Sequence, residues 1–301
     1  MTLIRSTVFL LPGLALAACT GEDVSLAGSA ATASPACAPT MSAGAGPVTD
    51  PSGPYYHQVV IARTADGIAL TGAHQVLDHA SVPDGVRLAD GTVLVYYVNG
   101  AAGSVWVARL DGDSLTALRA ISVNGITAPA GVVDPDAVLQ SDGRVRLAYF
   151  GGFASPASAG ARAICLADSG DGMNFTVKST ALSYAEGELL TDPSEIQLGD
   201  GTWLMAISRG QQSVIARSTD GLTFTREATL SLGGVPELAV APDGSVRLYV
   251  CAAGIVTYRS GDAGRTWTRE GTVAGPGFKG KPIVCDPSLV AGAGLFVFKT
   301  G

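Results

Sequence analysis

The chain has 301 residues, of which 47% are hydrophobic, 15% are charged and 6% are aromatic. Its 39 glycines and 16 prolines argue against a helical bundle, and a mean hydropathy of +0.32 argues against a disordered chain. With 19 basic and 26 acidic side chains the net charge is −7, which argues against binding of nucleic acid through a basic face. The length allows one large all-β domain or two smaller ones.

Residues 1–18 have the pattern of a cleaved export signal, with Arg5 near the start, an apolar run and small residues before a cysteine. The run is too short for a membrane-spanning helix of about 20 residues. The sequence LAAC that ends at Cys19 resembles the bacterial lipobox, which implies that Cys19 is acylated and anchors the protein to the membrane. Thr20, which follows, implies the outer membrane of the cell envelope. The alternative is an ordinary cleavage site followed by a chance cysteine.

Residues 20–52 are rich in Ala, Ser, Gly, Thr and Pro and show no apolar period. We therefore expect residues 19–52 to be a lipidated cysteine with a flexible tether, and residues 53–301 to be the folded domain. Cys37 is expected to lie outside the core. Export implies an oxidising compartment, and a disulfide between Cys251 and Cys285 is one candidate pairing. No Cys or His spacing indicates zinc.

A proline, six further residues and then a tight turn recur along the chain. Asp-Gly turns follow Pro83, Pro135, Pro193 and Pro236, and Pro287 reaches Ala293-Gly294 one residue early. Asp-Gly between apolar runs is a strong hairpin signal. A strand is predicted after each turn, over Val93–Val98, Val145–Phe150, Trp203–Ser208, Val246–Cys251 and Leu295–Lys299.

A second element alternates with the first. Residues 260–267 read SGDAGRTW and match the Asp-box pattern S-x-D-x-G-x-T-W, and shortened copies begin at Ser218, Ser169 and Thr64, with a degenerate copy at 111–115. The aspartate of such a motif is expected to accept backbone N–H groups of its own turn, which is a structural role and not a catalytic one.

The order of the two elements predicts an all-β fold, a five-bladed β-propeller with four strands per blade. An Asp-box copy within 57–77 comes first and a proline element comes last, so the N-terminal strand pair should complete the blade that the C-terminal strands begin. Closing the ring in this way removes exposed sheet edges.

The innermost strand of each predicted blade begins at the recurrent proline, and the residues on either side of that proline should share one face. Six of these ten positions are acidic, namely Asp84, Asp134, Asp136, Asp192, Glu237 and Asp286. We weigh a ligand-binding or catalytic ring in the central channel against turn-capping aspartates. Glu195 has the opposite parity, which favours packing between blades unless a β-bulge intervenes.

Five further residues are candidates for ligand contact near the channel. His79 is weighed against a surface loop histidine, Tyr97 and Tyr149 against core packing, and Arg209 and Lys281 against solvated charges. Tyrosine faces can stack on sugars, and the two cations can balance the acids.

The Asp-boxes resemble those of bacterial sialidases and other BNR-repeat proteins over most of residues 57–275. That family uses three arginines, a Tyr/Glu pair and an Asp acid. The stretch VDPDAVLQSDG over 133–143, with Asp192-Pro193 and Asp286-Pro287, resembles five-bladed glycosidases of the arabinanase and β-xylosidase type. This second resemblance implies an Asp base, an Asp that tunes pKa values and a Glu acid on inner strands, and inversion at the sugar carbon.

The first functional hypothesis is therefore an exported, lipid-anchored, monomeric hydrolase that removes a terminal sugar from a glycan. Asp84 would be the base, Asp134 and Asp136 would tune pKa values and orient the sugar, and Glu195 or Glu237 would be the acid, with Asp192 and Asp286 binding substrate. The alternatives are a non-catalytic module that binds glycan or protein, with Ca²⁺ in the central channel, and an exo-sialidase. No cofactor is otherwise expected.

Overall fold

The computed structural model describes residues 34–44, 48, 50–153, 162–183 and 187–301. The predicted signal, Cys19 and part of the predicted tether lie outside these residues. The described residues form an all-β fold with three short 3-10 helices, η1 (Pro35–Cys37), η2 (Pro54–Tyr56) and η3 (Phe278–Gly280). No helix in this part of the chain has the length and apolar character needed to cross a membrane.

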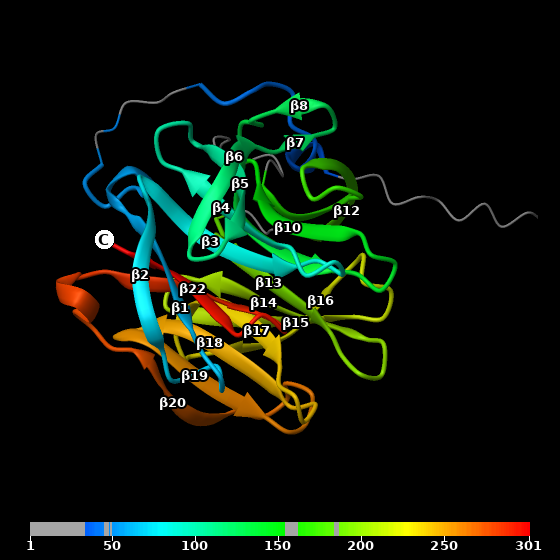
Figure 1. Cartoon of the computed structure of the whole chain (residues 1–301). Coiled ribbons are helices and arrows are strands. Elements are labelled where there is room, and N and C mark those ends of the chain that lie inside the picture. The colour runs from blue at the N-terminus through cyan, green and yellow to red at the C-terminus, as the bar shows by residue number, and fades with distance from the viewer. Residues whose placement is uncertain (1–33, 45–47, 49, 154–161, 184–186) are drawn as a thin grey trace, which may run out of the picture. The chain divides into compact units, whose positions relative to one another are not determined.

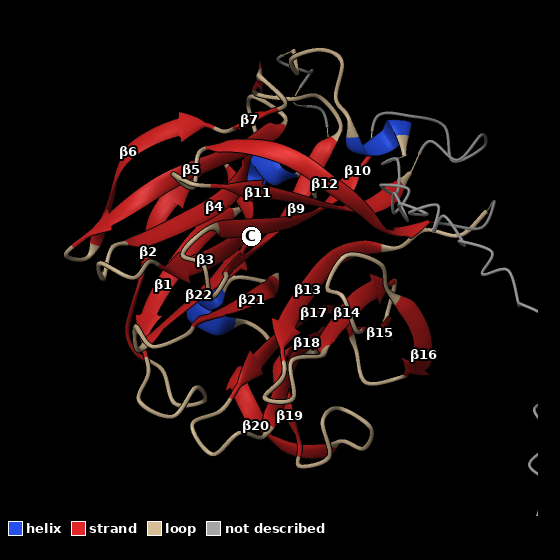
Figure 2. Cartoon of the chain, turned by 90° about the vertical axis from the view of Figure 1, so that its right-hand side faces the viewer, coloured by secondary structure: helices blue, strands red, loops and turns tan. Residues whose placement is uncertain are grey.

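Five sheets of antiparallel strands surround a central axis (Figures 1 and 2). Four of these blades follow one another along the chain. Blades 1 and 2 consist of β3 (Ala80–Arg87), β4 (Val93–Asn99), β5 (Ser104–Asp111) and β6 (Ser114–Ala120), and of β9 (Val132–Leu139), β10 (Val145–Gly151), β11 (Ala163–Ser169) and β12 (Asn174–Ser183). Blade 3 consists of β13 (Thr191–Gln197), β14 (Trp203–Arg209), β15 (Gln212–Ser218) and β16 (Thr225–Leu230). Blade 4 consists of β17 (Gly234–Val240), β18 (Val246–Ala252), β19 (Gly254–Ser260) and β20 (Thr268–Ala274).

Blade 5 combines the two ends of the domain. The C-terminal strands β21 (Val284–Val290) and β22 (Leu295–Thr300) pair with β1 (Gln58–Arg63) and β2 (Thr71–Asp78), in the order β2-β1-β22-β21. The predicted five-bladed propeller with four strands per blade and a split closing blade is confirmed. Blade 2 carries one addition, a hairpin of β7 (Ser122–Val123) and β8 (Ile126–Thr127) beside β12.

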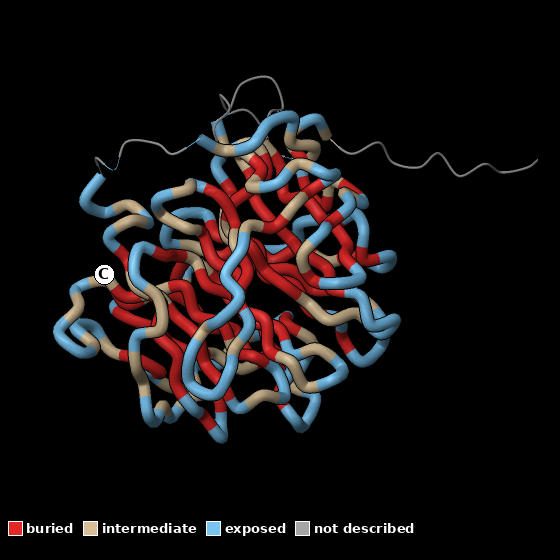
Figure 3. Tube along the Cα trace, turned by 45° about the horizontal axis from the view of Figure 1, so that its top comes forward, coloured by how far each residue is buried: buried red, intermediate tan, exposed pale blue. Residues whose placement is uncertain are grey.

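The innermost strands β3, β9, β13, β17 and β21 stand next to one another around the axis. The buried apolar residues form clusters that each draw on two neighbouring blades, as Val86 of β3 and Val145 of β10 do in one of them. The buried parts of the chain surround the axis, and the turns at the ends of the blades are exposed (Figure 3). Burial of these facing side chains is what holds the blades together.

The predicted tether is partly packed against blade 2. The expectation that Cys37 lies outside the core is wrong, because Cys37 is fully buried and forms a disulfide with Cys165 of β11. The hydroxyl of Tyr149 donates to the carbonyl of Cys37 over 2.5 Å. The second disulfide joins Cys251 of blade 4 to Cys285 of blade 5, as considered from the sequence.

The segments predicted to be Asp-box copies occupy the turns between the third and fourth strands of their blades. In the full copy, Asp262 accepts the backbone N–H groups of Arg265 and Thr266 at 3.1 and 2.8 Å, and Ser260 accepts that of Gly264. Asp220, Asp171 and Asp66 accept backbone N–H groups of their own turns in the same way. These bonds lower the pKa of Asp66 and Asp220 below the ordinary range, as expected for carboxylates that accept several N–H groups.

Candidate functional site

The inner strands share a backbone feature at the recurrent proline. The residue before each proline has φ between 47° and 53°, in the left-handed region, and the pairing with the second strand shifts register there. These residues are Val82, Asp134, Asp192, Val235 and Asp286. A residue other than glycine costs about 1–2 kcal/mol in this conformation, and five copies at one level of the ring mark a β-bulge built into every blade.

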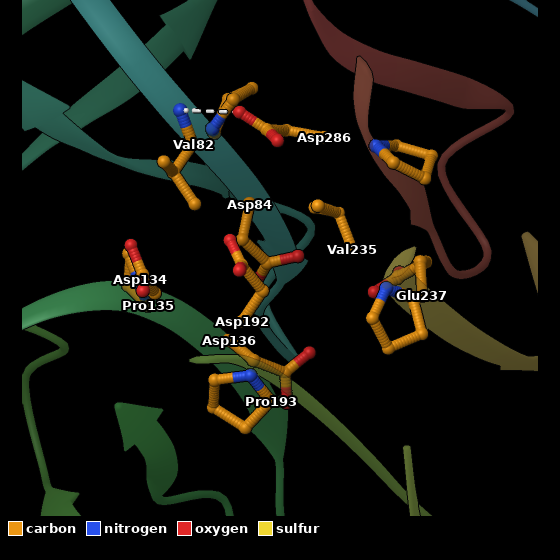
Figure 4. Close-up of a pocket in the computed structure, with 13 residues that line it drawn as sticks. Val82, Asp84, Asp134, Pro135, Asp136, Asp192, Pro193, Val235, Glu237 and Asp286 are labelled. Atoms are coloured by element: carbon orange, nitrogen blue, oxygen red, sulfur yellow. Dashed lines mark hydrogen bonds between the residues drawn. The ribbon is translucent and has the colours of Figure 1, made fainter. Parts of the chain in front are cut away.

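The bulge corrects the simple alternation assumed from the sequence. Residues before and after the proline both line one cavity on the axis, but they do so at successive levels of the strand (Figure 4). We call Val82, Asp134, Asp192, Val235 and Asp286 the mouth residues. The six predicted acids therefore meet at one cavity, in two layers.

The cavity enclosed by the mouth residues is small. A water-sized sphere can be centred in only about 20 Å³ of it, which is room for about one water molecule. Four mouth residues are half-buried and Asp286 is buried. A ligand larger than a water molecule does not fit inside this cavity.

One buried cation balances the mouth acids. Nζ of Lys299, on β22, lies 2.8 Å from Oδ2 of Asp286, and the two side chains are 14% and 3% exposed. Burial alone would lower the pKa of Lys299, but the carboxylates of Asp286, Asp192 and Asp134 raise it above its ordinary value. The same carboxylate oxygen also accepts a hydrogen bond, since the backbone N–H of Val82 donates to Oδ2 of Asp286 over 3.1 Å (Figure 4).

Asp134 and Asp192 are the remaining acids of the mouth. Burial and the charges of Asp192 and Asp286 raise the pKa of Asp134 well above its usual value. Burial and the charge of Asp286 raise the pKa of Asp192 to about 6. Both carboxyl groups of this pair therefore hold a proton to a higher pH than an exposed aspartate does.

The residues after the prolines form a second layer, which connects the blades. We call Asp84, Asp136, Ser194, Glu237 and Ser288 the latch residues. Each accepts the backbone N–H of the second residue after the proline of the next blade. The five bonds are Ala137 to Asp84 at 2.6 Å, Glu195 to Asp136 at 3.0 Å, Leu238 to Ser194 at 2.9 Å, Leu289 to Glu237 at 3.2 Å and Gly85 to Ser288 at 3.0 Å. The set closes into a complete ring around the axis.

Three latch carboxylates converge in this layer. One oxygen each from Asp84, Asp136 and Glu237 lies within 4.8 Å of the other two, and all three residues are buried. Burial raises the pKa of Asp84 to about 7 and raises the pKa values of Asp136 and Glu237 well above their usual value. Inverting hydrolysis needs two carboxyl groups about 6.5–9.5 Å apart with a water between them, so the observed packing does not suit these residues to the roles of base and acid.

Glu195 follows the latch position and turns away from the axis. Its carboxyl group lies between blades 2 and 3, 3.9 Å from Nε of Arg146, and neither oxygen accepts a hydrogen bond. Arg146 in turn bonds Asp168 and the carbonyl of Gly221 and lies over the ring of Trp203. Burial raises the pKa of Glu195 to about 8, because the attraction of Arg146 offsets it only in part. This placement matches the packing alternative raised for Glu195.

The remaining sequence candidates lie away from the mouth cavity. Tyr97 and Tyr149 are buried in the blade cores and offer no face to solvent. His79 is an exposed loop residue that stacks on Tyr55 with ring centroids 3.9 Å apart. Arg209 pairs with Glu188 at 3.6 Å on the outer part of blade 3, and Lys281 lies in the loop before β21.

Lys299 forms an ion pair with a mouth acid but was not among the site residues expected from the sequence. It lies on the second strand of blade 5, directly opposite Cys285 in the pairing with β21, and so reaches the bulged Asp286 next along that strand. Counting residues along the strand that follows the turn at Gly294 would have placed Lys299 opposite the start of β21. The signal in the sequence was a single lysine in an otherwise apolar strand.

Comparisons with known proteins support the fold. No protein-family model matches the sequence, and no curated protein does. An N-acetylgalactosamine deacetylase from F. plautii, in complex with blood group B trisaccharide, has TM-score 0.54 and 16% identity, over 72% of this chain and 77% of that one. An exo-1,5-α-L-arabinanase from a bovine ruminal metagenomic library gives 0.53 and 15%, over 73% and 87%. The α-L-arabinanase of Penicillium chrysogenum, complexed with arabinobiose, gives 0.52 and 13%, over 76% and 80%.

Proposed function

We propose that this protein hydrolyses a terminal sugar of a glycan at the channel mouth, as an exported protein anchored to the outer membrane through Cys19. The observation that carries the proposal is the pair of half-buried carboxyl groups, Asp134 and Asp192, which both have raised pKa values and lie beside the ion pair of Lys299 and Asp286. The two disulfides support export, because such bonds persist in oxidising compartments. The carbohydrate ligands of the structural neighbours support the substrate class.

The proposed step uses one water molecule. The carboxylate of Asp192 takes a proton from the water in the small cavity while its oxygen attacks the anomeric carbon. The bond from that carbon to the leaving oxygen breaks, and protonated Asp134 gives its proton to this oxygen. The ammonium group of Lys299, 2.8 Å from Asp286, places one positive charge beside the acids of the mouth.

The test is hydrolysis of a panel of aryl glycosides by the wild-type protein, by Asp134→Asn and by Asp142→Asn. Asp142 is an exposed aspartate of the β9–β10 turn and serves as the matched control. We expect cleavage of at least one substrate, a loss of 10²-fold or more in Asp134→Asn, and no change in Asp142→Asn. Cleavage by Asp134→Asn at the wild-type rate would contradict the proposal.

A second function is favoured by the converging latch carboxylates. Three carboxylate oxygens within 4.8 Å of one another can share one Ca²⁺, whose ligands lie at about 2.3–2.6 Å. Asp84, Asp136 and Glu237 would hold the ion, and the protein would then bind a glycan without cleaving it. This function predicts that Ca²⁺ raises the melting temperature relative to EDTA and that no aryl glycoside is cleaved.

The sialidase alternative receives no support at the mouth. The mouth cavity is lined by Val, Pro, Asp and Glu residues of the described chain, without an arginine. Recognition of a sugar carboxylate needs cationic donors. Three arginines, Arg63, Arg87 and Arg109, line a different hollow of the described chain.

A further inference from the structure

A second hollow lies at the other end of the inner strands, between blades 5 and 1. It measures about 520 Å³ and is lined by Arg63 at the end of β1, Arg87 at the end of β3 and Arg109 near the end of β5. The β3–β4 turn at 90–92 and the β21–β22 turn at 292–293 complete it. Along β3, Arg87 is five residues from Val82, or about 16 Å from the mouth. We call it the arginine hollow.

The positive charge of the arginine hollow is largely unpaired. Arg63 forms an exposed ion pair with Asp113 at 2.8 Å. Arg87 and Arg109 form no ion pair or side-chain hydrogen bond with any described residue. Asp90 is the one acid in the lining, and its carboxylate already accepts the backbone N–H of Thr92 in its own turn.

In a neighbouring hollow, the arginine side chains are paired with acidic residues. Between blades 4 and 5, Arg247 and Arg259 line a hollow of about 560 Å³. Glu270 lies 2.7 Å from the first and 3.1 Å from the second, and Asp243 also pairs with Arg259. The described arginines of that hollow thus have acidic partners within 4.0 Å, whereas Arg87 and Arg109 have none at that distance among the described residues. The hydrogen bonds of Thr92 and, more weakly, the charge of Arg109 lower the pKa of Asp90, so this acid offsets part of the positive charge of the hollow.

We propose that the arginine hollow binds an oxyanion group, a carboxylate, sulfate or phosphate, on a small polar ligand. Guanidinium groups present paired N–H donors that match such groups and keep their charge at every physiological pH. The volume suits a ligand of monosaccharide to disaccharide size. The lining contains neither tyrosine nor glutamate, so the site binds without the groups that a sialidase would need. The inference does not rest on the proposed hydrolysis at the mouth.

Binding of D-glucuronate, inorganic sulfate and inorganic phosphate, measured by titration calorimetry or NMR at low ionic strength, tests this site. The three probes distinguish the source of the oxyanion, and D-glucose is the neutral control. We expect at least one anion to bind and Arg87→Gln and Arg109→Gln each to weaken it about tenfold, the effect of losing a charge-assisted hydrogen bond. Raising the salt concentration should weaken it as well.

Arg144→Gln is the matched control variant. Arg144 is an exposed arginine at the corresponding turn of blade 2 and lies outside the lining of the hollow. Because all the substituted side chains are exposed, each variant should keep the wild-type melting temperature within about 2 °C. Failure of all three anions to bind, equal binding of D-glucose, or an equal loss in Arg144→Gln would each overturn the proposal.

Discussion

The residues beside the inner-strand prolines show how one backbone feature gives two chemical environments. The left-handed residue before each proline places its side chain at the mouth, and the residue after it faces the next blade. Asp134 and Asp136 are two positions apart, yet the first is half-buried at the mouth and the second is a buried latch. The roles of these acids follow from which side of the proline they occupy.

At the scale of single residues, substitution of Lys299 gives a testable prediction. Lys299→Met removes the buried partner of Asp286 and should destabilise the protein by about 3–5 kcal/mol at pH 8. The loss should be smaller at pH 5, where Asp192, with its pKa of about 6, is protonated. Urea unfolding at the two pH values measures both effects.

Lys281→Met is the control for this substitution. Lys281 lies in a loop and its ammonium group forms no ion pair or hydrogen bond with a described residue, so its replacement should change the free energy of unfolding by no more than about 0.5 kcal/mol. An equal effect of the two substitutions would show that Lys299 does not act through the mouth acids.

At the scale of the strands, the latch ring joins each inner strand to the next without any covalent bond. Ser288 of β21 illustrates the device, because its hydroxyl accepts the N–H of Gly85 and donates to Asp84 over 2.7 Å. The bond spans the seam between the two ends of the chain, 203 residues apart. The seam is therefore held by the latch as well as by the pairing of β1 with β22.

Ser288→Ala should destabilise the protein by about 1–3 kcal/mol, since it leaves a buried N–H group and a buried carboxyl oxygen without a partner. Ser114→Ala, on an exposed strand of blade 1, is the control and should have no measurable effect. Thermal unfolding of both variants provides the measurement. Equal melting temperatures for Ser288→Ala and the wild type would argue against a role of the ring in stability.

Part of this element structure could be predicted from the sequence. Proline, Asp-Gly and Asp-box spacings report local turn geometry, so the strand after each turn was placed within one residue, as β4 (Val93–Asn99) shows. The disulfide of Cys37 and the ring of latch bonds join residues that are far apart in the chain and leave no local pattern. The left-handed residue before each proline is also invisible, because a residue in that position usually favours an extended conformation.

At the scale of the whole molecule, the acids fall into two populations with opposite effects on stability. Burial alone would raise the pKa of the turn aspartate Asp171, but its several hydrogen bonds together outweigh burial and lower the pKa to about 2. Such turn aspartates stabilise the fold above their unfolded pKa of 3.8. Acids of the inner strands have raised pKa values, about 6 for Asp192, 7 for Asp84 and 8 for Glu195. At pH values between the unfolded and the folded pKa, these carboxyl groups are therefore protonated in the folded protein and ionised in the unfolded chain.

Stability should consequently be greatest at about pH 4–5 and should fall as the pH rises towards 8, because the folded state binds more protons over this range. His57, whose pKa burial lowers to about 4, opposes this trend as a single group. Urea unfolding in EDTA across this range is the measurement, and Glu195→Gln should reduce the fall. A free energy of unfolding that increases steadily from pH 5 to pH 8 would contradict the raised pKa values of these acids.

One matched pair of variants tests the central claim most directly. The claim is that the acids before the prolines act on the ligand, whereas the acids after the prolines join neighbouring blades. Asp134→Asn keeps an acceptor but removes the acid, and Asp136→Ala removes the acceptor of the N–H of Glu195. Both are measured for glycoside hydrolysis at 25 °C and for urea unfolding. We predict that Asp134→Asn loses hydrolysis at unchanged stability, and that Asp136→Ala loses about 1–3 kcal/mol of stability while its folded fraction keeps hydrolysis. Loss of hydrolysis in Asp136→Ala at unchanged stability, with Asp134→Asn active, would contradict the account.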